Sequence, residues 1–511
     1  MFGVSEVPDD AKSLRDRART TSPHITNLNV APTSRATFTM FIPISKRRFE
    51  AYFYGRSPHV KDFTTEVNWY ACEVEGVTLL AVVLRCHIDD DYNAIVLARD
   101  LAKRFRAVET VVSLPTADEA IQEAAKRIPR IVAKAVDGMV SQSDEAESPF
   151  GIFASKVPEH KQNQYLKMLL NDPTYYPARV AMEELAHWFE DPDGIFIRGL
   201  QGNEFNSRLF ELYLQAVFYE LDFNIDHSHP QPDYLLSKGG MTVAVEAATV
   251  AELEDEEIGD QPIKEETIAA LLEHVEKAMP FKFQRTLAKK VRHRPEPLGL
   301  PYWELPHTKG HPFVIAVHDY SMAMSMATSQ GSLQKFLYGL ELIDGKMVPV
   351  ERHEYEGRTI SSNFFAQPGN RHVSAVMLAT GATIPKFNRM GRLAGVRSST
   401  SMAVVYGART DAEGNPYPFK SIVDDGDYYE AWHDGIYMFH NPNAAIPLQP
   451  ELFHRVIHCF RDRDRLIEYL PPNYILSSVT QMFRFKESQA DEFRRQFNLD
   501  DFQPDRPIED D

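Results

Sequence analysis

The chain has few cysteines for its length, since Cys72, Cys86 and Cys459 are the only ones among its 511 residues. An odd number of widely spaced cysteines favours neither a disulfide framework nor a cysteine-based zinc site. Long apolar runs are also missing: no window of about 18 uncharged apolar residues occurs, so no membrane span is predicted. The N-terminus lacks the basic start and apolar run of a signal peptide, and we therefore expect a cytoplasmic protein.

Common catalytic motifs are missing as well. The sequence has no Gly-x-x-x-x-Gly-Lys phosphate loop, no Gly-x-Gly-x-x-Gly and no Gly-x-Ser-x-Gly nucleophile elbow, which disfavours the usual NTPase, dinucleotide-dependent and hydrolase functions. His227 and His229 alternate as two ligands on one strand would. No cysteine or third histidine follows them at a recognised zinc spacing, so a surface loop is the favoured interpretation.

The charge is unevenly distributed. Hydrophobic residues make up 43% of the chain and charged residues 25%, as in a globular protein, and the net charge of -18 disfavours indiscriminate binding to a polyanion. One segment differs, because residues 277–294 contain no acidic residue. Its seven basic residues are Lys277, Lys282, Arg285, Lys289, Lys290, Arg292 and Arg294.

The length predicts roughly two to four domains. The order of expected elements predicts the α/β class, α+β overall, with a central mixed sheet flanked by helices and a separate small N-terminal α+β domain. The expected segments are a flexible arm at 1–35, an antiparallel meander plus helix at 36–140, a linker and helical segment at 141–200, a core at 201–330, an α/β extension of that core at 331–490 and an acidic tail at 491–511.

The N-terminal domain is predicted from short β-rich runs broken by turn residues. A helix follows them, with Thr116 as N-cap and Glu119 three residues later, as in a capping box. The expected strands are Thr37–Ile42, Asn68–Glu73, Thr78–Arg85, Asn93–Arg99 and Phe105–Val112.

The core is predicted as a helix, three strands, a helix and a strand. The first helix is Glu204–Leu221 with Asn203 as a cap, and Pro280 should kink or divide the second. The strand expected after that helix should run parallel to the third strand. The remaining expected elements are strands Leu221–Ile225, Tyr234–Leu236, Thr242–Thr249 and Phe313–Val317, helix Glu265–Arg292, and later strands Val373–Ala379, Met402–Tyr406 and Ile436–Phe439 that extend the sheet, with helix Pro450–Arg461.

Two acidic residues in this core are candidate functional residues. Glu246 interrupts an apolar strand, and a buried carboxylate needs a cation, a basic side chain or solvent beside it. A structural salt bridge with Arg208 is one alternative to a metal ion. Asp233 directly follows Pro232, and its alternative is an ordinary aspartate at a turn. Glu204 and Arg208 also form an i,i+4 pair that stabilises a helix without any function.

Pro232-Asp233, twelve further residues and Glu246-Ala247-Ala248 resemble the signature of the PD-(D/E)XK nuclease superfamily, which has the restriction-endonuclease-like fold. This resemblance implies that Asp233, Glu246 and the Ala247 carbonyl hold Mg²⁺ or Mn²⁺, that Glu204 or Glu211 completes the metal site, and that DNA phosphodiesters are hydrolysed. The lysine of the family pattern is replaced by Ala248. The following helix offers Lys282, Lys289 and Lys290 as substitutes, and Lys289 is our leading candidate, ahead of Lys282.

The basic segment is a candidate nucleic-acid contact in any case, because phosphate contacts supply most sequence-independent affinity. The residues expected to make it are Lys282, Arg285, Lys289, Lys290 and Arg292. Two alternatives to a DNA nuclease stay open: an inactive protein of the same fold that binds nucleic acid or protein, and a purely structural or assembly protein. A homo-oligomer is also open.

Two further runs, Phe387–Arg392 and His440–Ala444, resemble those of uncharacterised bacterial proteins. That resemblance implies no activity. Within the first run, Arg389 and Arg392 are candidate phosphate contacts.

Overall fold

The computed structural model describes residues 41–57, 59–145, 151–189, 195–226, 228–250, 274–294, 296–321, 325–425 and 428–500. The expected arm at 1–35 lies outside these residues, as do His227 and the last part of the acidic tail. The described chain divides into two compact units. The first comprises residues 41–55 and 59–145, and the second comprises residues 56–57 and the described residues from 151 onward. No helix in these ranges is long and apolar enough to cross a membrane.

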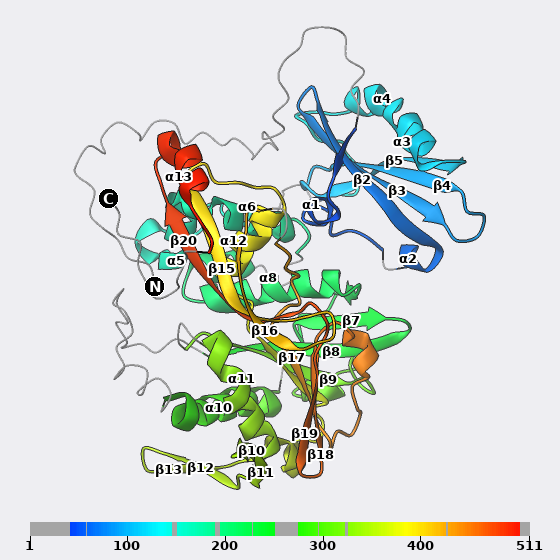
Figure 1. Ribbon diagram of the computed structural model, residues 1–511. Coiled ribbons are helices and arrows are strands. Elements are labelled where there is room, and N and C mark those ends of the chain that lie inside the picture. Colours follow the sequence, from blue (N-terminus) through cyan, green and yellow to red (C-terminus); the bar gives the residue numbers. More distant parts are fainter. Residues whose placement is uncertain are drawn as a thin grey trace. The chain divides into compact units, whose positions relative to one another are not determined.

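The first unit is built on a five-stranded antiparallel sheet in the order β1-β2-β3-β4-β5, which confirms the predicted meander (Figure 1). Thr116 caps the helix that follows, because its hydroxyl accepts a hydrogen bond from the Glu119 N–H. The elements are β1 Ile42–Ile44, α1 Lys46–Glu50, α2 Val60–Phe63, β2 Thr64–Val74, β3 Val77–Cys86, β4 Tyr92–Arg99, β5 Phe105–Leu114, α3 Ala117–Ala125 and α4 Ile128–Val132.

Both faces of this sheet are covered, because alternate residues of β3 point to opposite sides. Leu79 and Ala81 pack with Ala120 and Ala124 of α3, whereas Leu80 and Val82 pack with Phe49 of α1 and its neighbours. The unit therefore has a hydrophobic core on each side of one sheet.

The second unit contains an eight-stranded mixed sheet in the order β19-β18-β17-β14-β9-β8-β7-β6. The expected parallel pair is confirmed, since β8 runs parallel to β9 after the helical connection. The strands are β6 Asn224–Asp226, β7 Tyr234–Lys238, β8 Met241–Val250, β9 Phe313–Asp319, β14 Ala375–Ala379, β17 Ile436–His440, β18 Ile457–Asp462 and β19 Arg465–Tyr469.

Helices cover both faces of this sheet at β8. On one face, Ala244 and Ala248 pack with Phe283 and Leu287 of α10 (Met279–Arg292). On the other face, Thr249 meets Ser207 of α8 (Phe205–Glu220), with 3.2 Å between their hydroxyl oxygens. The other α-helices of the unit are α5 Gln164–Asn171, α6 Tyr176–Ala186, α7 Phe196–Gln201, α11 Ser325–Tyr338, α12 Ile384–Leu393 and α13 Ala490–Gln496.

Some helix boundaries differ from the prediction. In the helical segment, α5 and α6 are separate helices, and Pro177 lies in the first turn of α6, where proline is tolerated because the N–H has no helical partner. The N-cap of α8 is Glu204, without a side-chain cap, and not Asn203. Pro280 stands at the start of α10, directly after a π-helical turn at His274–Ala278.

The C-terminal part departs more strongly from the prediction. Residues 450–461 are not a helix: a short 3₁₀ turn at Pro450–Phe453 precedes β18, because Ile457–Cys459 pair with β17 and tertiary pairing outweighs local helical preference. The strand expected at Met402–Tyr406 exists but belongs to a separate sheet, β16-β15-β20. The strands of this sheet are β15 Ser401–Thr410, β16 Pro416–Ile422 and β20 Ile475–Arg484. Two further pairs of strands form hairpins, β10 Leu340–Ile343 with β11 Lys346–Pro349 and β12 Arg352–Tyr355 with β13 Arg358–Ser361.

Candidate functional site

Asp233 and Glu246 lie side by side where β7 and β8 pair. Tyr234 is opposite Val245 in this antiparallel pair, so the preceding residue Asp233 stands next to Glu246. The Asp233 N–H donates to Glu246 Oε2 at 3.2 Å, and Asp233 Oδ2 accepts from the Ala247 N–H at 2.7 Å. The fold thus brings together the two acids on which the sequence interpretation depends.

Glu246 is buried, with 4% of its surface exposed, and two side chains satisfy one of its oxygens. Lys290 Nζ lies 2.5 Å from Glu246 Oε1, and the Tyr302 hydroxyl donates to the same oxygen at 2.7 Å. The alternative of a salt bridge between Glu246 and Arg208 is wrong, because Arg208 pairs with Glu204 and Glu211.

The lysine beside Glu246 is therefore Lys290 and not Lys289, which is exposed. Lys290 comes from α10, and α10 covers the face of β8 that carries both Glu246 and Ala248. Its ammonium group consequently approaches Glu246 from the side where a lysine at position 248 would project. A signal for this was present in the sequence, since Lys290 continues the apolar stripe of Phe283 and Leu287 at i, i+4, i+7.

Burial and crowding shift the pKa values of this cluster. Burial, and then the charge of Glu246, raise the pKa of Asp233 to about 7. Burial, and then the charge of Asp233, raise the pKa of Glu211 to about 8. Burial alone would lower the pKa of Lys290, but attraction to Glu246 and Asp233 outweighs it and the pKa is raised. Burial therefore favours the protonated forms of Asp233 and Glu211, and the neighbouring carboxylates add to this effect.

Glu211 and Glu204 are held by Arg208 on the other side of the acid pair. Arg208 Nη1 lies 2.9 Å from Glu211 Oε1, and Arg208 Nη2 lies 2.7 Å from Glu204 Oε2. In the described part of the chain, no group of three or more His, Cys, Asp or Glu side chains is arranged to hold a metal ion. The four acids expected as metal ligands therefore do not form one metal site. Of these four, Asp233 and Glu246 are the two that lie in direct contact.

This pair fits a hard divalent cation by its chemistry. Carboxylate oxygens are the ligands that Mg²⁺ and Mn²⁺ prefer. Asp233 Oδ1 accepts no hydrogen bond from the described residues, so it remains available as a ligand. When ionised, Asp233 and Glu246 carry two negative charges, and the ammonium group of Lys290 pairs with one of them.

The basic segment separates into two faces. Arg285, Lys289 and Arg292 are exposed and follow each other at i, i+4, i+7, as a solvent-facing stripe does. The Nζ atom of Lys282 is buried, so this residue does not present its charge at the surface as expected. Lys290, also expected as a nucleic-acid contact, points instead to Glu246.

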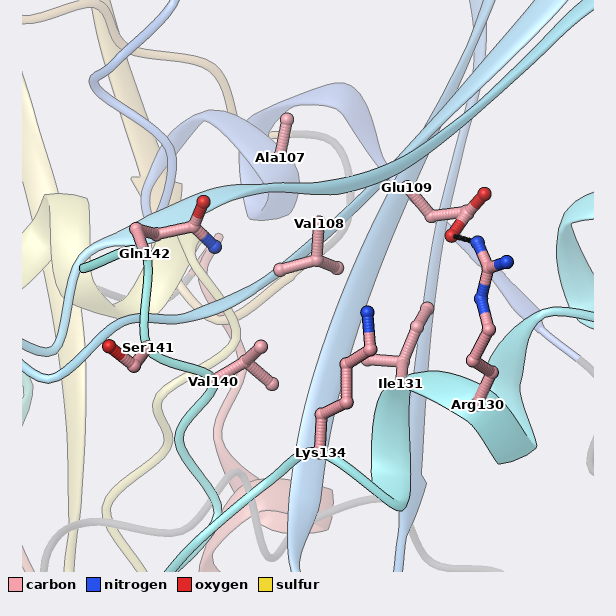
Figure 2. Close-up of a pocket in the computed structure, with 9 residues that line it drawn as sticks. All are labelled: Ala107, Val108, Glu109, Arg130, Ile131, Lys134, Val140, Ser141 and Gln142. Carbon is pink, nitrogen blue, oxygen red and sulfur yellow. Dashed lines mark hydrogen bonds and ion pairs between the residues drawn. The ribbon is translucent and has the colours of Figure 1, made fainter.

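Two other candidate regions are structural. Arg389 and Arg392 are buried and pair with Glu430 and Asp424, so they are not phosphate contacts. In the first unit, β5 and α4 border a cavity of about 170 Å³, which Figure 2 shows with its Glu109–Arg130 ion pair. This cavity contains no second carboxylate that would parallel the Asp233–Glu246 pair.

No known family model, curated protein or solved structure matches this chain.

Proposed function

We propose that this protein hydrolyses phosphodiester bonds in DNA with Mg²⁺ or Mn²⁺, through a PD-(D/E)XK-like site in a restriction-endonuclease-like core. The observation that carries the proposal is the meeting of Asp233, Glu246 and Lys290 from three separate elements. An acid directly before β7, an acid in β8 and a lysine from the following helix supply the residue types of that chemistry, although Ala248 stands where the family pattern has lysine.

Each of the three side chains has a role in this proposal. Asp233 and Glu246 would hold the cation, which when bound polarises the phosphodiester and lowers the pKa of the attacking water. Lys290 would orient that water and stabilise the negative charge that develops on the phosphate. Tyr302 positions Glu246, because its hydroxyl donates to the carboxylate that Lys290 also contacts.

The competing function is an inactive protein of the same fold that binds nucleic acid or protein. It is favoured by the 2.5 Å contact between Lys290 and Glu246, because a lysine that neutralises the acid competes with a cation for it. The exposed stripe of Arg285, Lys289 and Arg292 serves binding equally well under both functions.

The test is cleavage of plasmid and linear DNA by the purified chain with Mg²⁺, Mn²⁺ or EDTA. We expect cleavage that needs the metal and that Asp233→Asn and Glu246→Gln abolish. Glu413→Gln is the matched control, because Glu413 is an exposed carboxylate in the same unit and should retain activity. DNA bound but not cleaved under any of these metals would show the binding protein instead.

A further inference from the structure

Three flat side chains form a surface next to the acid pair. Trp303 belongs to the 3₁₀ turn Tyr302–Glu304 and has two flat neighbours. The guanidinium carbon of Arg294 lies 5.9 Å from the centre of the indole ring. The ring of His372 lies 5.0 Å from it, with only 2° between the ring planes. Arg294, Trp303 and His372 are named the stacking surface below.

Trp303 of the stacking surface follows a residue that contacts the acid pair. Tyr302 directly precedes Trp303, and its hydroxyl donates to Glu246 Oε1 at 2.7 Å. A group bound on Trp303 is therefore one residue away from the side chain that contacts Glu246. His293, at the end of α10, stacks on the Tyr302 ring at 5.3 Å and extends the aromatic region toward the helix.

The charge around this surface favours a polyanion. Arg294 of the stacking surface is exposed, and so are its sequence neighbour Arg292 and the residue before His372, Arg371. The exposed acids close to Arg294 and Trp303 in sequence are Glu296 and Glu304. Cations interleaved with flat rings suit unpaired nucleotides, because the cations meet phosphates while the rings stack on bases. A duplex offers the phosphates but keeps its bases stacked internally.

We propose that the stacking surface binds single-stranded nucleic acid and so selects substrates with unpaired nucleotides for the Asp233–Glu246 site. This inference rests on the proposed function for its role in cleavage, but the binding that it assigns does not depend on cleavage. An unpaired base extends the row of flat groups, and the attached phosphates reach the exposed arginines.

The experiment is fluorescence anisotropy of the full chain in EDTA, where metal-dependent cleavage cannot interfere. The probes are a labelled mixed-sequence DNA strand of about 20 nucleotides, long enough for a stacking site, the RNA strand of the same sequence, and the DNA duplex. We expect a single strand to bind at least about tenfold more tightly than the duplex, since stacking contributes roughly a fivefold to hundredfold gain per base. The DNA and RNA arms show which sugar is preferred.

The variants separate stacking from charge. His372→Ala should weaken single-strand binding by roughly fivefold or more and affect duplex binding little. Arg294→Ala also removes a charge, so it should weaken duplex binding too, but less than single-strand binding. Arg285→Ala, the matched control, removes one exposed charge of α10 away from the stacking surface and should weaken both probes equally. Trp303→Phe keeps a flat ring and should retain single-strand preference, whereas Trp303→Leu should lose it.

Equal affinity for strand and duplex would overturn the inference, and so would equal effects of Arg294→Ala and Arg285→Ala. Its failure is distinguishable from failure of the proposed function. Preference for the single strand without metal-dependent cleavage would support this inference and contradict the proposed nuclease function. Cleavage without strand preference keeps the nuclease and removes this inference.

Discussion

Lys290 Nζ lies 2.5 Å from Glu246 Oε1, although the two residues are 44 positions apart in the chain. The contact forms because α10 covers the face of β8 that carries Glu246 and Ala248. The ammonium group of Lys290 therefore lies beside Glu246, although β8 itself carries no lysine next to this acid.

Replacement of Lys290 by Met should reduce DNA cleavage by about 10²–10³-fold, the usual cost of removing one group that stabilises transition-state charge. Methionine keeps the apolar stem of the side chain and removes only the ammonium group. Lys346→Met is the matched control, since Lys346 is an exposed lysine on β11 with no role in the proposed site, and it should cleave nearly normally. Equal losses in both variants, with circular dichroism showing both folded, would contradict the role of Lys290.

Tyr302→Phe should destabilise the protein by about 1.5–3 kcal/mol, because it removes a buried hydrogen bond to a charged group. The ring contacts of Tyr302 with His293 and Phe313 remain. Urea denaturation measures the change, with Tyr469→Phe as an exposed control that should change little. An unchanged urea midpoint for Tyr302→Phe would show that the hydroxyl does not hold Glu246.

Glu430→Gln should destabilise the protein by about 3–5 kcal/mol at neutral pH, because it leaves buried cations without their partner. Glu430 lies 2.7 Å from Lys386 Nζ and 2.6 Å from Arg389 Nη2, and all three are buried. Thermal unfolding measures this, and Glu413→Gln on the surface should stay within about 0.5 kcal/mol of the wild type.

The ion pairs of Glu430 with Lys386 and Arg389 also predict a pH dependence of the stability. Burial raises the pKa of Glu430, but Arg389 and Lys386 more than offset it and lower the pKa to about 2. A lowered carboxyl pKa stabilises the fold above the ordinary value of about 4.5 and loses that contribution as the pH falls toward 2. The difference between wild type and Glu430→Gln should therefore stay constant above pH 4.5 and shrink below it. A constant difference down to pH 3 would refute this.

His318 predicts acid sensitivity at a higher pH. Burial lowers its pKa from 6.5 to about 4. Between pH 6.5 and pH 4 the unfolded chain binds a proton at His318 that the folded protein does not bind. The contribution of His318 to the free energy of unfolding is therefore fully present above pH 6.5 and falls by up to about 3 kcal/mol toward pH 4. His318→Gln should flatten the decrease of the urea midpoint between pH 7 and pH 5, whereas His160→Gln on the surface should not. Parallel curves for wild type and His318→Gln would exclude this contribution.

Local patterns were sufficient for much of the fold. Short β-rich runs broken by turn residues predicted the strands of the first unit, and Thr116 with Glu119 predicted a helix start that the structure confirms. The same reasoning failed at residues 450–461, because Ile457–Cys459 pair with a strand whose position depends on the rest of the sheet. Pairing between distant segments leaves little trace in a short window of sequence.

The site shows the same division. The sequence by itself marked Asp233 and Glu246 as candidates, because an acid after Pro232 and an acid in an apolar strand are local features. Only the tertiary structure decided that Lys290 and not Lys289 meets Glu246, that Arg208 takes Glu204 and Glu211, and that Tyr302 joins the cluster. Adjacent residues of a helix point about 100° apart, so which one faces the sheet depends on how the whole helix packs.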